Sequence, residues 1–157
     1  MDIPDEISQL KKRLTRLEEK ESIKDVVYGY VYAVDAKDIE QTMALFDDMI
    51  KLEYVQDNVR LDGKSAVRDF YQQIFDRYDV LMHKIANVMI RTDDLETSGR
   101  SYWMVYEILK EGGGERWGEG YYHHRFVKTA DGWKISELTI NARYFRVEKR
   151  DVLEVGF

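Results

Sequence analysis

The feature that most constrains the fold is a change in hydrophobic period halfway along the chain. Before about residue 80, apolar side chains recur every three or four positions, which is typical of amphipathic helices. Beyond it, segments rich in β-branched and aromatic residues predict four long strands, at 82–91, 100–110, 117–128 and 133–147. Helices followed by antiparallel strands predict an α+β fold, in which about three helices cover the concave face of a curved antiparallel sheet.

Turn signals between these segments predict that the strands form a meander. The signals are Asp93-Asp94, Gly112 to Gly114, and Asp131-Gly132. The glycine run lacks a following Lys and Ser or Thr, so it predicts a hairpin and not a phosphate loop. We expect the tail, residues 148–157, to lie across an opening or a neighbour.

The N-terminal segment predicts an amphipathic helix with a narrow apolar seam. The seam consists of Ile7, Leu10, Leu14 and Leu17. It packs on its own domain or on another subunit, and it is too short to establish a coiled coil. Ser22 with Asp25 resembles a capping signal, so we expect the helix to restart there.

Further signals divide the stretch up to residue 80. We expect Asp38 to cap a second helix, Ile39 to Phe46, which Asp47-Asp48 ends. Residues 50–55 and 59–61 predict two short strands joined by a polar turn. A third amphipathic helix then follows the turn Asp62-Gly63.

Composition excludes several function classes. The 157 residues suit one domain over residues 1–157, and the net charge of -6 argues against a nucleic-acid partner. No apolar run approaches the roughly 18 residues of a membrane span. The chain has no cysteine, which excludes disulfides and thiolate chemistry, and the N-terminus has no signal-peptide pattern. We therefore expect a cytoplasmic protein with no membrane partner.

Short motifs in a fixed order resemble the SnoaL-like, or nuclear transport factor 2-like, α+β cone superfamily. After the first long helix these are YVYAVDAKD at 30–38, LFDD at 45–48, the helix start at 63–70, MHKIANVMI at 82–90 and DGWKI at 131–135. The resemblance covers about 14–147. It is greatest to a lyase branch that includes bile acid 7α-dehydratase, scytalone dehydratase and hexachlorocyclohexane dehydrochlorinase.

The resemblance also implies a set of catalytic residues. The branch has an Asp at the end of the first long helix and a His at the start of the third strand, which here are Asp35 and His83. Tyr30 and Arg146 match a further Tyr and Arg of the bile acid enzyme. The implied roles are His83 as base, Asp35 as its orienting partner, Tyr30 as acid and Arg146 as oxyanion stabiliser. No metal or cofactor is implied.

Helix geometry sets a condition on this arrangement. At about 100° per residue, Tyr30 and Asp35 are separated by about 140° around a regular helix. We therefore expect Asp35 to lie past the regular helix, in a turn with Ala36 and Lys37. The alternative is that Asp35 is only a cap or turn residue.

Other residues are candidates for the lining of a substrate pocket. The aromatic ones, which otherwise fill the core, are Tyr54, Trp103, Tyr106 and Tyr122. Asn87, four residues after His83, is expected on the same strand face, where it reaches the substrate, orients the His or satisfies backbone groups.

The adjacent histidines His123 and His124 face opposite sides of a strand, which makes a shared metal site unfavourable. His124 lines the pocket or belongs to a cross-strand surface pair. Where the bile acid enzyme has a further acid on its fourth strand, this chain has Tyr106-Glu107 without a clean match.

These residues predict a cofactor-independent lyase. We expect it to eliminate water from a hydrophobic cyclic or aromatic small molecule, and the resemblance also allows formaldehyde or halide as the leaving group. An isomerase or polyketide-type cyclase with the same dyad remains an alternative, as does a non-catalytic ligand-binding module. The resemblance further implies a homo-oligomer, with a trimer favoured.

Overall fold

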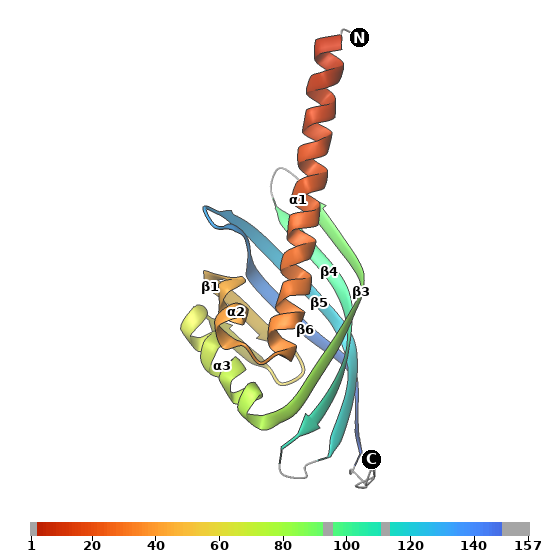
Figure 1. The fold of residues 1–157 in the computed structure, drawn as a ribbon. Coiled ribbons are helices and arrows are strands. Elements are labelled where there is room, and N and C mark those ends of the chain that lie inside the picture. The colour runs from red at the N-terminus through yellow and green to blue at the C-terminus, as the bar shows by residue number, and fades with distance from the viewer. Residues whose placement is uncertain (1–2, 93–95, 111–113, 149–157) are drawn as a thin grey trace, which may run out of the picture.

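The computed structural model describes residues 3–92, 96–110 and 114–148 (Figure 1). The helices are α1 (Ile3–Asp35), α2 (Ile39–Ala44) and α3 (Lys64–Arg77). The strands are β1 (Phe46–Tyr54), β2 (Val59–Asp62), β3 (Tyr78–Thr92), β4 (Thr97–Leu109), β5 (Glu115–Thr129) and β6 (Gly132–Glu148). The α+β class predicted from the sequence is confirmed.

The strands form one curved sheet in the order β2-β1-β6-β5-β4-β3. The long strands β3 to β6 pair as the predicted antiparallel meander, whereas β1 lies parallel to β6. The helices lie against the hollow side of the sheet, with α1 crossing it and α2 and α3 beside β1 (Figure 1). The core therefore lies between the helices and the concave face.

Helix α1 has two halves with different surroundings. It is continuous through Ser22, whose hydroxyl donates to the carbonyl of Glu18 at 2.9 Å, so the predicted restart at Ser22 is wrong. Residues 3–18 are exposed and project from the body, whereas the second half buries Ile23, Val27 and other side chains (Figure 1). No helix in the described ranges is both long and apolar enough to cross a membrane.

Asp38 caps α2 as predicted, because its carboxylate accepts a hydrogen bond from the backbone N–H of Gln41 at 2.9 Å. The helix ends earlier than expected. The carbonyl of Leu45 accepts from the N–H of Ile135 on β6 at 2.9 Å, so the chain turns into sheet pairing at Phe46. Asp47-Asp48 therefore lie within β1 and do not end the helix.

The observed strands overlap all the predicted segments and are mostly longer, although the predicted 50–55 and 100–110 each run one residue past the end of β1 and β4. The turn at 56–58 joins β1 to β2, and the one at Asp131-Gly132 joins β5 to β6, with Gly132 at a φ of +103° that favours glycine. Asp93-Asp94, Gly112-Gly113 and the tail from residue 149 lie outside the described residues.

Two of the register shifts in the sheet decide which way Asn87 and Arg146 point. The pairing of β3 with β4 shifts between Ala86 and Met89, and that of β5 with β6 shifts between Glu119 and Gly120. An extra residue in one strand bends the sheet and reverses the facing of the side chains that follow it, up to the next irregularity.

Candidate active site

A cavity of about 450 Å³ lies between the concave face of the sheet and helices α1 and α3. Its walls are mainly apolar and aromatic. The polar or charged side chains at the cavity include His83 from β3, Glu107 from β4 and Arg116 from β5. A largely apolar pocket with a few convergent polar groups is the usual form of a small-molecule site.

Asp35 and His83, 48 positions apart in sequence, are in direct contact. One carboxylate oxygen of Asp35 accepts the backbone N–H of His83 at 2.8 Å, and the other lies 2.5 Å from ring Nδ1. With an ionised Asp35, this contact keeps the proton on Nδ1 and leaves Nε2 as the basic nitrogen. Because His83 lines the cavity and Asp35 does not, the carboxylate acts through the imidazole.

Asp35 is the last residue of α1, not part of the turn beyond it as expected. The turn contributes in another way. Lys37 adopts a φ of +53°, and its ammonium donates to the carbonyls of Tyr78 and Asp79 at 3.1 and 3.0 Å. This contact ties the end of α1 to the start of β3, the strand that carries His83.

Tyr30 lines the same cavity from the preceding turns of α1. Its hydroxyl is 2.7 Å from that of Tyr71 on α3, and its ring contacts Tyr122 at a centroid distance of 5.9 Å. Burial raises the pKa of the Tyr30 phenol to about 12 and raises the pKa values of Tyr71 and Tyr122 well above the usual range. The three phenols are therefore protonated near neutral pH, and Tyr30 is able to donate a proton or hydrogen bond.

The cavity also contains an ion pair that the sequence reasoning did not assign. Nε of Arg116 lies 2.8 Å from an oxygen of Glu107, and the guanidinium lies 4.3 Å from the ring centre of Phe145. Burial raises the pKa of the Glu107 carboxyl, although the positive charge of Arg116 opposes this effect. The alternation of side chains along a strand could have predicted both residues at the cavity. Glu107 lies on the same face of its strand as Trp103, and Arg116 lies on the same face as Tyr122.

Two glycines leave room for aromatic side chains at the cavity. A Cβ on Gly120 would overlap the ring of Trp103 and the carbonyl oxygen of Asn141. A Cβ on Gly118 would likewise overlap the ring of Phe145. Trp103 and Phe145 therefore lie across glycine positions of β5 as they line the cavity.

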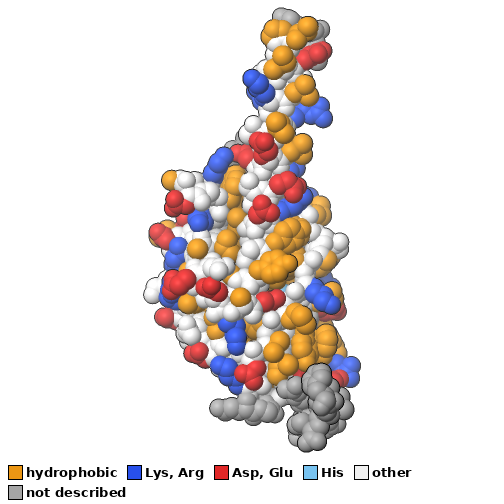
Figure 2. All heavy atoms as spheres, viewed as in Figure 1, with side chains coloured by type: hydrophobic (Ala, Val, Ile, Leu, Met, Phe, Trp, Pro, Cys, Tyr) orange, Lys and Arg blue, Asp and Glu red, His pale blue; other side chains and the backbone are white. Residues whose placement is uncertain are grey.

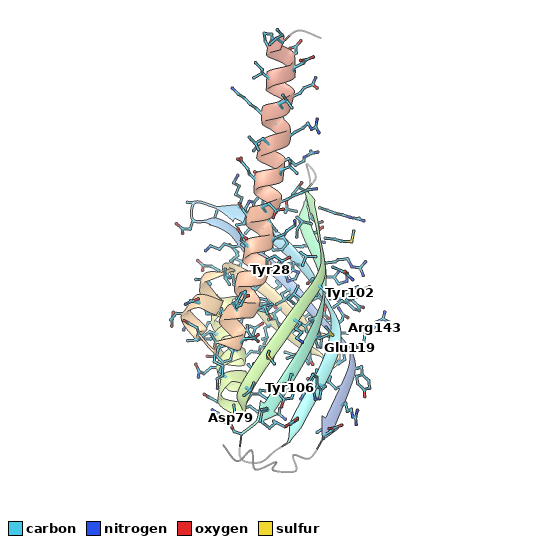
Figure 3. All side chains as sticks on the ribbon, turned by 45° about the vertical axis from the view of Figure 1, so that its right-hand side comes forward. Tyr28, Asp79, Tyr102, Tyr106, Glu119 and Arg143 are labelled. Atoms are coloured by element: carbon cyan, nitrogen blue, oxygen red, sulfur yellow. The ribbon has the colours of Figure 1, made fainter. Side chains whose placement is uncertain are left out.

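Of the four aromatic residues expected to line a pocket, Tyr54, Trp103 and Tyr122 do so. Tyr106 does not. Its ring packs at a tilt against Trp117 with ring centres 4.5 Å apart, on the outer face of the sheet (Figure 3). Trp103 and Tyr106 are three residues apart on one regular strand, so they necessarily face opposite sides.

Arg146 and Asn87 lie outside the cavity because of the two register shifts. On β6 the inward positions include Ile140 before the shift and Phe145 after it, so Arg146 faces outward and pairs with Glu148. Its side chain is 63% exposed. Asn87 lies in the irregularity of β3 with a φ of +53° and is exposed, so it does not share the inward face of His83.

His123 and His124 face opposite sides of β5, as expected. His123 is exposed, whereas His124 is buried between Tyr122 and Phe126, and neither ring nitrogen has a hydrogen-bond partner among the described residues. Burial lowers the pKa of His124 to about 3. His124 is thus a neutral core residue that does not line the cavity. Within the described ranges, no three His, Asp or Glu side chains gather as a metal site.

Solved structures with the same fold come from proteins of several descriptions. One from Novosphingobium aromaticivorans, provisionally assigned as a scytalone dehydratase, has a TM-score of 0.78 and 21% identity, covering 88% of this chain and 91% of its own. A type 2 hexachlorocyclohexane dehydrochlorinase, LinA, has a TM-score of 0.78 and 17% identity, with 87% and 93% covered. A protein from N. aromaticivorans that is provisionally assigned as an aromatic ring hydroxylase has a TM-score of 0.77 and 20% identity, covering 84% of this chain and 94% of its own.

At these identities the likeness establishes the fold alone. A comparison with functionally curated proteins finds no match. A family model, in contrast, matches residues 15–139, which run from the exposed half of α1 to about the middle of β6. The chain belongs to the SnoaL-like domain family.

Proposed function

We propose that the protein is a lyase that eliminates water from a hydrophobic cyclic or aromatic small molecule. The observation that carries the proposal is the contact of Asp35 with His83, which puts an oriented imidazole on the wall of a mainly apolar cavity. The dehydratase and dehydrochlorinase among the structural relatives are consistent with an elimination.

In the proposed reaction, Nε2 of His83 removes a proton from a carbon next to an electron-withdrawing group. The electron pair of that C–H bond forms the new double bond, and the bond to the neighbouring hydroxyl breaks with its electrons on oxygen. Tyr30 protonates the departing oxygen, and the proton held by His83 then restores Tyr30. His83 and Tyr30 together account for every proton transferred in this reaction. Formaldehyde and halide are the other leaving groups that the resemblance allows.

Arg116 takes the part that the resemblance gave to Arg146. It is a cation at the cavity, where developing negative charge on an oxygen of the substrate is stabilised most effectively. Glu107 holds the guanidinium in place and offsets part of its charge. Tyr54, Trp103 and Tyr122 supply the flat apolar walls for a ring-shaped substrate.

The test is product analysis over a panel of hydroxylated steroids and lignin-type aromatics. A lyase product is lighter than its substrate by the mass of water, whereas an isomerase or cyclase using the same residues yields a product of unchanged mass. With a substrate identified, we expect His83→Ala and Asp35→Asn to lose turnover and retain binding. His123→Ala is the matched control, because His123 is exposed on the other face. Undiminished turnover in both variants would contradict the proposal.

We further propose that the protein is cytoplasmic and works as a homo-oligomer, with a trimer favoured by the resemblance. Large apolar side chains exposed on the outer face of the sheet are consistent with self-association; they include Tyr102, Met104 and Trp117. Sedimentation analysis of the purified chain measures the number of copies.

A further inference from the structure

The exposed half of α1 has an apolar seam without a partner. The seam consists of Ile3, Ile7, Leu10, Leu14 and Leu17, which are between 48% and 70% exposed. Figure 2 shows these apolar side chains along the helix where it projects from the body. Five large aliphatic residues on one stripe of a projecting helix are costly to leave in water.

The seam has the spacing of a coiled coil. Successive members are separated by four, three, four and three residues, which is the alternation of heptad positions a and d. Glu21 occupies the next a position, so the apolar seam ends after Leu17. Two heptads are short for an isolated coiled coil, but the second half of α1 is held by the folded domain, which supplies the helix nucleus.

The seam also faces away from the domain that holds the helix. At about 100° per residue, the middle of the seam lies roughly 140° around the helix axis from the stripe that includes Ile23 and Val27. A second helix packed on the seam of α1 therefore does not collide with the sheet of the chain to which that α1 belongs.

The charged residues beside the seam favour a second copy of the same helix as its partner. In a parallel pair of identical helices, each g position faces the following e position of the partner. Here these pairs are Glu6 with Lys11 and Arg13 with Glu18, both of opposite charge. An antiparallel pair in which Leu10 packs against Leu14 of the other copy instead brings Lys11 against its own copy and Arg13 against its own copy.

From this juxtaposition we propose that residues 3–18 form a parallel, in-register coiled coil with the same segment of a second copy of this chain. The assembly joins the domains through their N-terminal helices. It leaves the outer face of the sheet and the cavity open. The proposal does not depend on the proposed function.

Disulfide trapping tests the arrangement directly, because the chain has no cysteine of its own. Under mild oxidation we expect the Leu10→Cys variant and the Leu14→Cys variant each to form a disulfide between the same position of two copies. Lys12→Cys, on the opposite side of the helix, is the matched control and should remain reduced. If only a mixture of the two seam variants is cross-linked, the helices are antiparallel, which would overturn the proposal. Cross-linking no greater than that of the control would overturn it equally.

A charge exchange tests the register. Glu6→Lys and Lys11→Glu each place like charges across the seam and should weaken self-association roughly tenfold in sedimentation analysis. The double variant restores opposite charges and should recover wild-type association. A double variant as weak as the single variants would refute the parallel register, because an antiparallel pair gains two repulsions from the same exchange.

Discussion

Asp35 holds His83 at two points, accepting its backbone N–H at 2.8 Å and lying 2.5 Å from its ring Nδ1. The two contacts fix both the position of the residue on β3 and the rotation of its imidazole. Lys37 adds a third tie between α1 and the start of β3 through the carbonyls of Tyr78 and Asp79. The basic nitrogen of His83 is thus oriented by groups that lie outside the cavity.

We expect Asp35→Asn to lower kcat by about 10²- to 10⁴-fold with little change in KM, because the carboxylate orients the base without lining the cavity. The double variant Asp35→Asn/His83→Ala should be no slower than His83→Ala alone, since Asp35 acts through the imidazole. Steady-state kinetics of the three variants measure this. Additive losses would show that Asp35 has a separate role.

Arg116→Gln should lower turnover, whereas Arg146→Gln should leave it near the wild-type value. Arg116 lies at the cavity beside Glu107, and Arg146 points outward to Glu148. The two variants make the same chemical change on opposite faces of the sheet, and kcat/KM compares them. A loss confined to the Arg146 variant would contradict the assignment of Arg116.

Tyr30→Phe should reduce both turnover and stability. Removing the Tyr30 hydroxyl leaves the buried Tyr71 hydroxyl without its 2.7 Å contact, which costs about 1–3 kcal/mol in the free energy of unfolding. Tyr32→Phe on the same helix is the control, because Tyr32 is largely exposed, and its effect should stay within about 0.5 kcal/mol. Urea denaturation measures both variants. Equal effects of the two substitutions would count against the hydroxyl pair.

Gly120→Ala should lower the free energy of unfolding by about 1–3 kcal/mol, because the added methyl overlaps Trp103 and a backbone carbonyl. Gly29→Ala makes the same change within α1, where the nearest side-chain atoms belong to Leu45 at 3.7 Å. That variant should instead be stabilised by about 0.5–1 kcal/mol. Urea denaturation tests this difference in sign, and a stabilised Gly120 variant would show that the Trp103 ring has room to move.

His124 should make the wild-type protein sensitive to acid. When unfolded it binds a proton near pH 6.5, but when folded its pKa is about 3. As the pH falls from 6.5 toward 3, the unfolded state gains the proton first, so stability falls by up to about 1.4 kcal/mol per pH unit.

His124→Leu should therefore flatten the decline in the free energy of unfolding over this pH range. His123→Leu is the control, because the pKa of exposed His123 is lowered less. Urea unfolding at several pH values gives the curves. Parallel curves for the wild type and the His124 variant would rule out a buried neutral imidazole.

The sequence by itself determined the class of fold and singled out Asp35 and His83, which the structure brings into contact. Hydrophobic period and turn residues are local signals, so they predicted the long strands and the cap at Asp38. The order of the family motifs then linked Asp35 with His83. The predicted break at Ser22 was wrong, because the serine hydroxyl can donate a hydrogen bond to a carbonyl of the preceding helical turn.

Only the tertiary structure decided which side chains reach the cavity. Strand alternation predicts facing only while the register is regular, and one extra residue reverses it. The shifts in β3 and β6 turned Asn87 and Arg146 outward, and Arg116 faces the cavity from the neighbouring β5. The contact of Asp35 with His83 likewise depends on packing, since α1 and β3 meet through residues 48 positions apart.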